Sequence, residues 1–81
     1  ESILTYPNPS SDVVNILYKS NSHETIQISL INDMGVVLER REVSQYGVLY
    51  QSFNTSNFEK GIYYIEVMQQ DKIVRKRVVV M

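Results

Sequence analysis

The 81-residue sequence contains no cysteine and no alanine, and it has one histidine, two prolines and three glycines. Without cysteine the chain has no disulfide, no thiolate nucleophile and no sulfur ligand for a metal. A single histidine excludes a histidine-rich metal site and leaves little for acid–base chemistry near neutral pH. The length suits one domain with one small core, and no cofactor is expected.

The chain also lacks a strong excess of charge and a long apolar run. Eight basic and nine acidic residues give a net charge of −1, which favours neither nucleic acid nor a membrane surface as partner. No apolar run approaches the roughly 20 residues of a membrane helix, so no membrane insertion is expected. The absence of an initiator methionine and a leader predicts that Glu1 is a cut point.

Residues that favour strands are abundant, since valine, isoleucine and threonine make up 22 of the 81 residues. Apolar residues alternate with polar ones in short runs, as at Val14, Ile16 and Tyr18 or at Ile26, Ile28 and Leu30. The predicted strands are 3–6, 13–18, 25–31, 36–43, 48–53, 62–68 and 73–80. About seven closely spaced strands over residues 1–81 predict one all-β, immunoglobulin-like sandwich, mostly antiparallel.

Turn residues separate the predicted strands. Pro7 and Pro9 restrict their neighbours, which predicts a stiff, extended segment over residues 6–9. Asn32–Gly35 is typical of a hairpin turn, and residues 69–71 are expected to connect a final hairpin. Phe58 is expected to close one end of the core.

No group of residues predicts catalysis, and we expect a protein that is not an enzyme. His23 lies in a polar turn without a nucleophile motif nearby, which is typical of a solvated loop histidine. Asp12, Asp33 and Asp71 lack the spacing of a calcium loop and are expected to form turns. The glycosylation-type triplet at residues 54–56 is interpreted as a loop.

The tyrosines leave two interpretations open. Tyr63 and Tyr64 are adjacent in one strand and therefore face opposite sides of the sheet, so at least one belongs to the core. Tyr18, Tyr50 and the outward member of that pair could instead form an exposed aromatic strip that stacks on sugar rings.

The C-terminal tail is the strongest asymmetry of the sequence. Four of the eight basic residues lie in the last ten positions, so residues 72–81 carry +4 and the remainder carries −5. Outward charges of this kind protect an edge strand from aggregation. They could equally form a recognition tail, basic and then apolar, with a free carboxylate that another protein captures.

Four segments together resemble the type A C-terminal sorting domain of the type IX secretion system of Bacteroidota. Tyr6-Pro7-Asn8-Pro9 is similar to the family's opening, and residues 28–37 are similar to its "strand, N/D-x-x-G, strand" centre. Residues 58–65 are similar to its "L-x-x-G-I/V-Y" segment, with Phe58 in place of leucine. Residues 75–80 resemble its basic, then apolar, end.

The resemblance extends from Tyr6 to Met81 in the family's order and spacing, with two departures. Ser10-Ser11-Asp12 stands where a glycine often follows P-N-P, and the chain ends in Met81 rather than in a basic residue.

The resemblance implies a non-catalytic address label on an upstream cargo. Its partners would be the type IX translocon and a sortase-like peptidase of the outer membrane. The cargo would cross the periplasm and reach the cell surface or the medium. Our hypothesis is that most of the recognition is carried by Lys76, Arg77, Val78, Val79, Val80 and Met81. The remaining motif residues, expected to be mainly structural, are Tyr6, Pro7, Asn8, Pro9, Gly35, Gly61 and Tyr63.

Other interpretations compete with this one. The chain could be an accessory binding module of a secreted enzyme, for carbohydrate or protein, or a small secreted sandwich with a structural or adhesive role. The short strand at residues 3–6 could also exchange between two copies, because the prolines after it form a stiff hinge. A mixture of monomer and strand-swapped dimer is therefore expected for the isolated domain.

Overall fold

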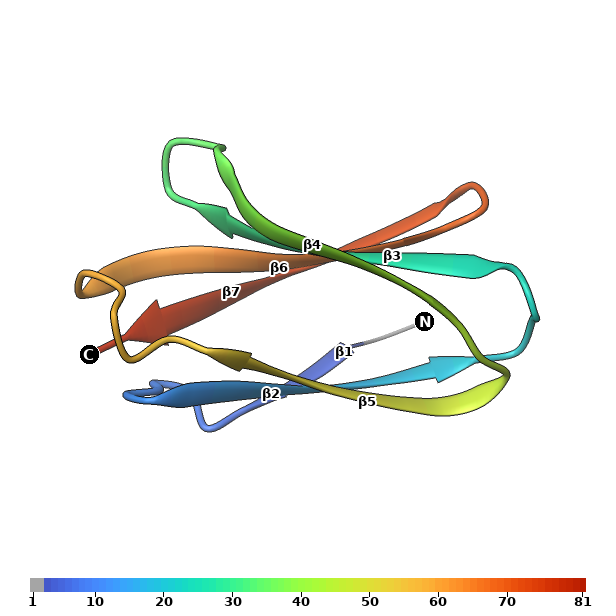
Figure 1. Ribbon diagram of the computed structural model, residues 1–81, viewed down its shortest axis with the longest axis horizontal. Helices are drawn as coiled ribbons and strands as arrows, with labels where there is room; N and C mark the ends of the chain where they lie inside the picture. Colours follow the sequence, from blue (N-terminus) through green and yellow to red (C-terminus); the bar gives the residue numbers. More distant parts are fainter. Residues whose placement is uncertain (1–2) are drawn as a thin grey trace.

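The computed structural model describes residues 3–81 and folds them into seven strands, with no helix among these residues (Figure 1). The strands are β1 (Ile3–Tyr6), β2 (Val13–Ser20), β3 (Thr25–Asn32), β4 (Val37–Ser44), β5 (Gly47–Asn54), β6 (Gly61–Gln69) and β7 (Lys72–Val80). The prediction of an all-β fold with about seven strands is confirmed.

The strands form two antiparallel sheets that pack face to face (Figure 1). One sheet has the order β1-β2-β5 and the other the order β4-β3-β6-β7. Consecutive strands β4 and β5 therefore lie on different sheets, and the chain crosses between the layers at Gln45 and Tyr46. This two-layer arrangement is the predicted sandwich.

The core fills the space between the sheets with the residues that alternation placed inward. Val14, Ile16, Ile26, Ile28 and Leu30 are at most 1% exposed, because β2 and β3 each turn every second side chain to the opposite sheet. The rest of the buried apolar cluster is Ile3, Tyr18, Leu49, Phe53, Tyr63, Ile65, Val67, Val78 and Val80.

A buried polar network joins the two sheets at one end of this core. The Tyr18 hydroxyl donates to Gln69 Oε1 at 3.1 Å, and Gln69 Nε2 donates to Ser20 Oγ and to the Glu24 carbonyl, both at 3.0 Å. Because each buried group has a partner, the network costs little desolvation and ties β2 to β6.

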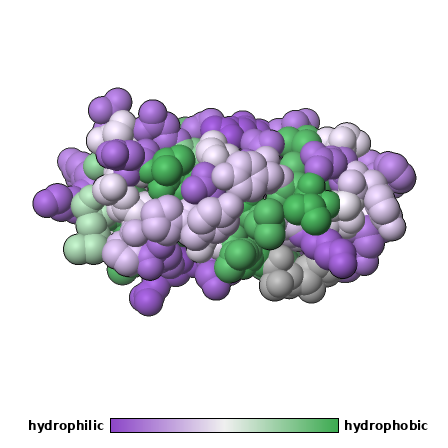
Figure 2. Space-filling model, turned by 90° about the horizontal axis from the view of Figure 1, so that it is seen from below, coloured by the Kyte–Doolittle hydropathy of each residue, from purple (hydrophilic) through white to green (hydrophobic). Residues whose placement is uncertain are grey.

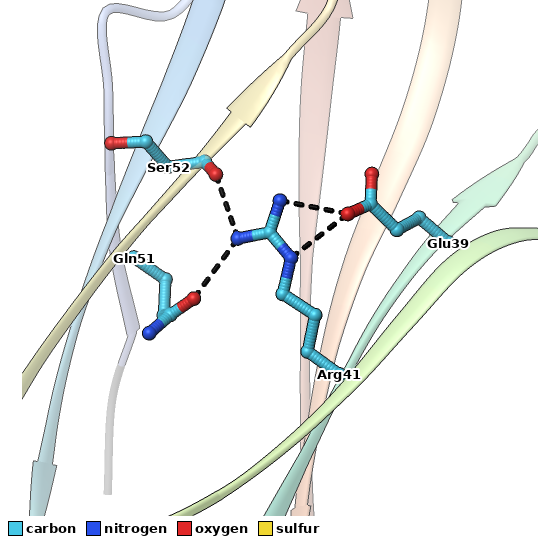
Figure 3. Close-up of polar contacts among 4 residues, drawn as sticks. All are labelled: Glu39, Arg41, Gln51 and Ser52. Carbon is cyan, nitrogen blue, oxygen red and sulfur yellow. Dashed lines mark hydrogen bonds and ion pairs between the residues drawn. The ribbon is translucent and has the colours of Figure 1, made fainter.

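Arg41 lies at the side of the sandwich where the edge strands β4 and β5 of the two sheets face each other (Figure 3). Its Nη1 donates to Gln51 Oε1 at 2.9 Å and to the Ser52 carbonyl at 2.7 Å, both on β5. Its Nε and Nη2 bind Glu39 Oε2 at 2.9 and 2.8 Å, and the guanidinium lies 4.0 Å from the centre of the Phe53 ring. Nη1 therefore links the two sheets, while Glu39 on the same strand as Arg41 holds the other two nitrogen atoms and fixes the orientation of the planar guanidinium.

Replacing Arg41 with alanine is expected to lower the free energy of unfolding by about 2 kcal/mol. The Ser52 carbonyl loses its charged donor and the Phe53 ring loses its cover. Arg41→Lys should restore only part of the loss, because an ammonium group cannot reproduce the fork. Urea unfolding measures both effects, with Arg40→Ala on the exposed face of β4 as control. Equal losses at Arg40 and Arg41 would contradict the bridging role.

Candidate functional site

The C-terminal strand β7 is an edge strand of the four-stranded sheet, paired with β6 along its whole length. Its side chains alternate, so that Val78 and Val80 are buried in the core at 0% and 3% exposure, while Val79 is half-buried on the outer face. The exposed members of the hypothesised recognition set are Lys76, Arg77 and Met81. The tail is therefore part of the folded core as well as a surface.

The four basic residues of the tail do not form one patch on one face. Alternation along β7 places Arg75 and Arg77 on the outer face and Lys72 and Lys76 on the opposite side. Arg75 is already paired, because its Nη2 lies 2.9 Å from Glu66 Oε2 on β6. All four side chains are exposed, so both sides of the edge carry positive charge.

The segment between β1 and β2 covers the C-terminal part of the free edge of β7. The Ser10 N–H donates to the Val79 carbonyl and the Met81 N–H donates to the Ser10 carbonyl, both at 2.8 Å, in a parallel bridge. The Asn8 amide extends this ladder, since its Oδ1 accepts from the Val79 N–H at 3.0 Å and its Nδ2 donates to the Arg77 carbonyl at 3.3 Å. We call Asn8–Ser10 the clamp.

The prediction that Tyr6-Pro7-Asn8-Pro9 runs extended is wrong. The chain bends at residues 7–9, and the peptide bonds before Pro7 and Pro9 are both cis. The bend is needed because the chain leaves the edge of the three-stranded sheet at Tyr6 and reaches β7 on the other sheet within a few residues.

The turn between β3 and β4 has the predicted chemistry. Asn32 Oδ1 accepts hydrogen bonds from the N–H groups of Met34 and Val36, both at 2.9 Å. The side-chain oxygen thus takes the place of a backbone carbonyl as the acceptor within the turn. Gly35 has a φ of 85°, a conformation that strongly favours glycine. Gly35 therefore serves turn geometry.

The segment that leads into β6 is fixed by its aromatic residues. The Tyr63 hydroxyl donates to the Glu59 carbonyl at 2.6 Å, and the Tyr63 and Phe58 rings stack with their centres 5.3 Å apart. A tyrosine at the start of this strand that binds the backbone upstream is a feature of immunoglobulin-like folds. Phe58 packs against the core as predicted. Gly61, with a φ of 152°, turns the chain from this loop into β6.

The motif segments, distant in sequence, gather at one end of the sandwich, on the left in Figure 1. The clamp binds residues 77–81, Asn32 pairs with Tyr63 across β3 and β6, and residues 32–34 and 59–63 line one shallow hollow. Sequence reasoning identified these segments separately but not their proximity, because contacts between residues about 70 positions apart leave no local pattern.

The aromatic strip proposed from the tyrosines is wrong. Tyr18 is 2% exposed in the core, Tyr50 lies on the outer face of the three-stranded sheet, and Tyr64 lies on the outer face of the other sheet. Instead, exposed Leu4 and Tyr50 flank Leu17 in register, and Figure 2 shows the apolar group on this face. A hydrogen bond with Tyr50 is the main reason why the pKa of Tyr6, on the same face, is raised.

The remaining candidates of the sequence do not assemble into a reactive group. Among residues 3–81, no three histidine, aspartate or glutamate side chains gather where they could hold a metal. His23 stacks on Tyr46 with the ring centres 5.1 Å apart. Within the same residues, no helix is available to cross a membrane.

A comparison with protein families identifies the family of the chain. The model of the secretion system C-terminal sorting domain family matches residues 4–81, nearly the whole chain. The chain belongs to this family, the sorting domains of the type IX secretion system. No curated protein matches the sequence. The tail and the motif segments around it are the candidate functional site of this sorting domain.

Replacing Asn8 with alanine is expected to speed hydrogen exchange of the Val79 amide by about tenfold, because this donor loses its acceptor. The free energy of unfolding should fall by about 1 kcal/mol. Amide exchange followed by NMR measures the first effect. Ser10→Ala is the matched control, since Ser10 contributes only backbone groups to the clamp. Equal acceleration in both variants would exclude a specific role of the Asn8 amide.

Proposed function

We propose that this sorting domain directs an upstream cargo through the type IX translocon in the outer membrane and takes no catalytic part. The cargo crosses the periplasm with the domain folded behind it. A sortase-like surface peptidase then removes the domain, and the cargo is released or attached to the cell surface. The observation that carries the proposal is the family match over residues 4–81.

The fold is compatible with this use as a label. Its core needs no disulfide, and the clamp joins the segment after β1 to the end of β7. A cut before Ile3 would leave β1, the clamp and the core in place, because all of them follow that point in the chain. The label could therefore stay folded before and after its separation from the cargo.

We assign recognition to the exposed part of the tail, Lys76, Arg77 and Met81, with Val79 at its side. Within residues 3–81, neither Lys76 nor Arg77 forms an ion pair, so both charges are available to an acidic partner surface. Val78 and Val80 contribute indirectly, since their burial fixes the positions of the exposed residues between and beside them.

The experiment fuses residues 1–81 behind a fluorescent reporter that carries a signal peptide, in a bacterium with a working type IX system. The fusion is expected to reach the cell surface or the medium. The double variant Lys76→Glu, Arg77→Glu should lower export by about tenfold or more, because like charges would then face the acidic partner. Reporter fluorescence in the medium, on cells and in the periplasm measures export.

The control carries the same change of charge elsewhere, as Lys19→Glu with Arg40→Glu, both exposed and outside the tail. Thermal unfolding verifies that both double variants remain folded. If the wild-type fusion stays in the periplasm, the proposed function is wrong. If the two double variants export equally well, the assignment of Lys76 and Arg77 is wrong.

A further inference from the structure

The free edge of β7 is covered along only one half. The clamp binds the Arg77 carbonyl, both backbone groups of Val79 and the Met81 N–H. These are the groups that point away from β6. Since the register between β6 and β7 has no shift, the same alternation turns the backbone groups of Ile73 and Arg75 outward as well.

The other half of this edge is open. Among residues 3–81, the backbone groups of Ile73 and Arg75 that point outward form no hydrogen bond. The Ile73 side chain is 60% exposed on this part of the edge. A row of unpaired N–H and C=O groups beside an exposed apolar side chain is the surface to which an extended chain can add as a strand.

We propose that an extended acidic segment of a partner protein adds to β7 at Ile73 and Arg75 as a further strand of the four-stranded sheet. This inference rests on the proposed function and specifies how the partner docks. The clamp determines the register of docking, because it occupies the edge from the Arg77 carbonyl onward and leaves only the part before it free.

The charge of the tail determines the chemistry of this segment. A strand beside β7 would have side chains next to Arg77 on the outer face and next to Lys76 on the other, so acidic residues on both faces are favoured. Arg75 is already neutralised by Glu66. An apolar residue of the partner would cover Ile73.

A second copy of the chain fits this edge poorly. Two β7 strands paired antiparallel about Arg75 would place Arg75 opposite its own copy and Ile73 opposite Arg77, with Val74 opposite Lys76. The same pairing would place Lys76 of each copy diagonally beside Lys76 of the other, and Lys76 forms no ion pair within residues 3–81 that would offset the repulsion. The partner is therefore a different, acidic chain.

The first test uses the reporter fusion with Ile73→Pro and Ile73→Ala. Proline removes the outward N–H of Ile73 and leaves the hydrogen bonds to β6, and prolines are tolerated near the start of an edge strand. Alanine removes the apolar side chain but keeps the N–H. Export of the proline variant should fall about tenfold below that of the alanine variant, because the partner's carbonyl loses its donor.

The outcomes separate this inference from the proposed function. If the wild-type fusion is exported and the folded proline variant is exported as well as the alanine variant, strand addition at Ile73 is wrong and the sorting function stands. If the wild-type fusion is not exported, the proposed function fails, and strand addition is then decided by the second measurement alone.

The second measurement needs no export and also applies if the proline variant does not fold. A capped peptide of alternating glutamate and valine is added to the isotope-labelled 81-residue chain. NMR shifts and slowed exchange at the Ile73 and Arg75 amides are expected, and a lysine–valine peptide should cause neither. Slow exchange at both amides without peptide would show that the edge is already paired and would contradict the proposal. The absence of shifts and of slowed exchange at about 1 mM glutamate–valine peptide would also overturn it.

Light scattering of the same samples tests whether a second copy of the chain occupies the edge of β7. The chain without peptide is expected to contain no dimer that forms through β7. A dimer that dissociates in the Ile73→Pro variant, and persists in Ile73→Ala, would show that a second copy fills the edge and would overturn the assignment to an acidic partner.

Discussion

The hydrogen bonds between the clamp and β7 join the first part of the chain to its last residues. The outward N–H of Val79 donates to the Asn8 side chain, and its outward carbonyl accepts from the Ser10 N–H. The last residues of β7 are therefore held between β6 and the clamp. A terminal strand normally frays, because its last residues have few contacts. With both edges paired, Val78 and Val80 can remain in the core up to the end of the chain. The exposed residues between them then have fixed positions.

In this arrangement neighbouring residues of the tail differ in whether their side chains lie in the core or on the surface. The side chains of Val78 and Val80 fill the core, whereas those of Arg77, Val79 and Met81 point to the outer face or beyond it. If the tail is recognised as proposed, a substitution at a buried position would impair folding and recognition together, since the exposed residues would lose their support. Only exposed positions, such as Lys76 and Arg77, can separate the two effects.

The strands could be predicted from the sequence because their signals are local. Alternation at Val14–Tyr18 and at Ile26–Leu30 identifies the face toward the core, and β2 keeps that pattern of burial, whereas in the central strand β3 Ser29 and Ile31 are buried as well. The Asn32–Gly35 turn was equally predictable, since the asparagine acts on residues two and four positions away. These features depend on neighbours in the chain, and a single sequence contains all the information that they need.

The clamp, the Arg41 bridge and the Tyr18 hydroxyl could not be predicted in this way. Asn8 binds a residue 71 positions away, and Tyr18 binds Gln69 at a separation of 51. The exposed strip that included Tyr18 is wrong, because Tyr18 alternates with Val14 and Ile16 and therefore faces the core. In that case the local pattern was the better guide, because a tyrosine can be buried when its hydroxyl finds a partner.

The charges of β7 serve an edge that the clamp covers only in part. Lysine and arginine keep an open strand edge from pairing with copies of itself, because like charges would lie opposite one another. In the proposed docking the same residues would attract an acidic chain, so protection against self-association and selection of a partner would follow from one charge distribution. Where the clamp closes the edge, such protection is unnecessary, and there the sequence changes from basic residues to valines. The boundary between Arg77 and Val78 thus coincides with the beginning of the clamped part of the strand.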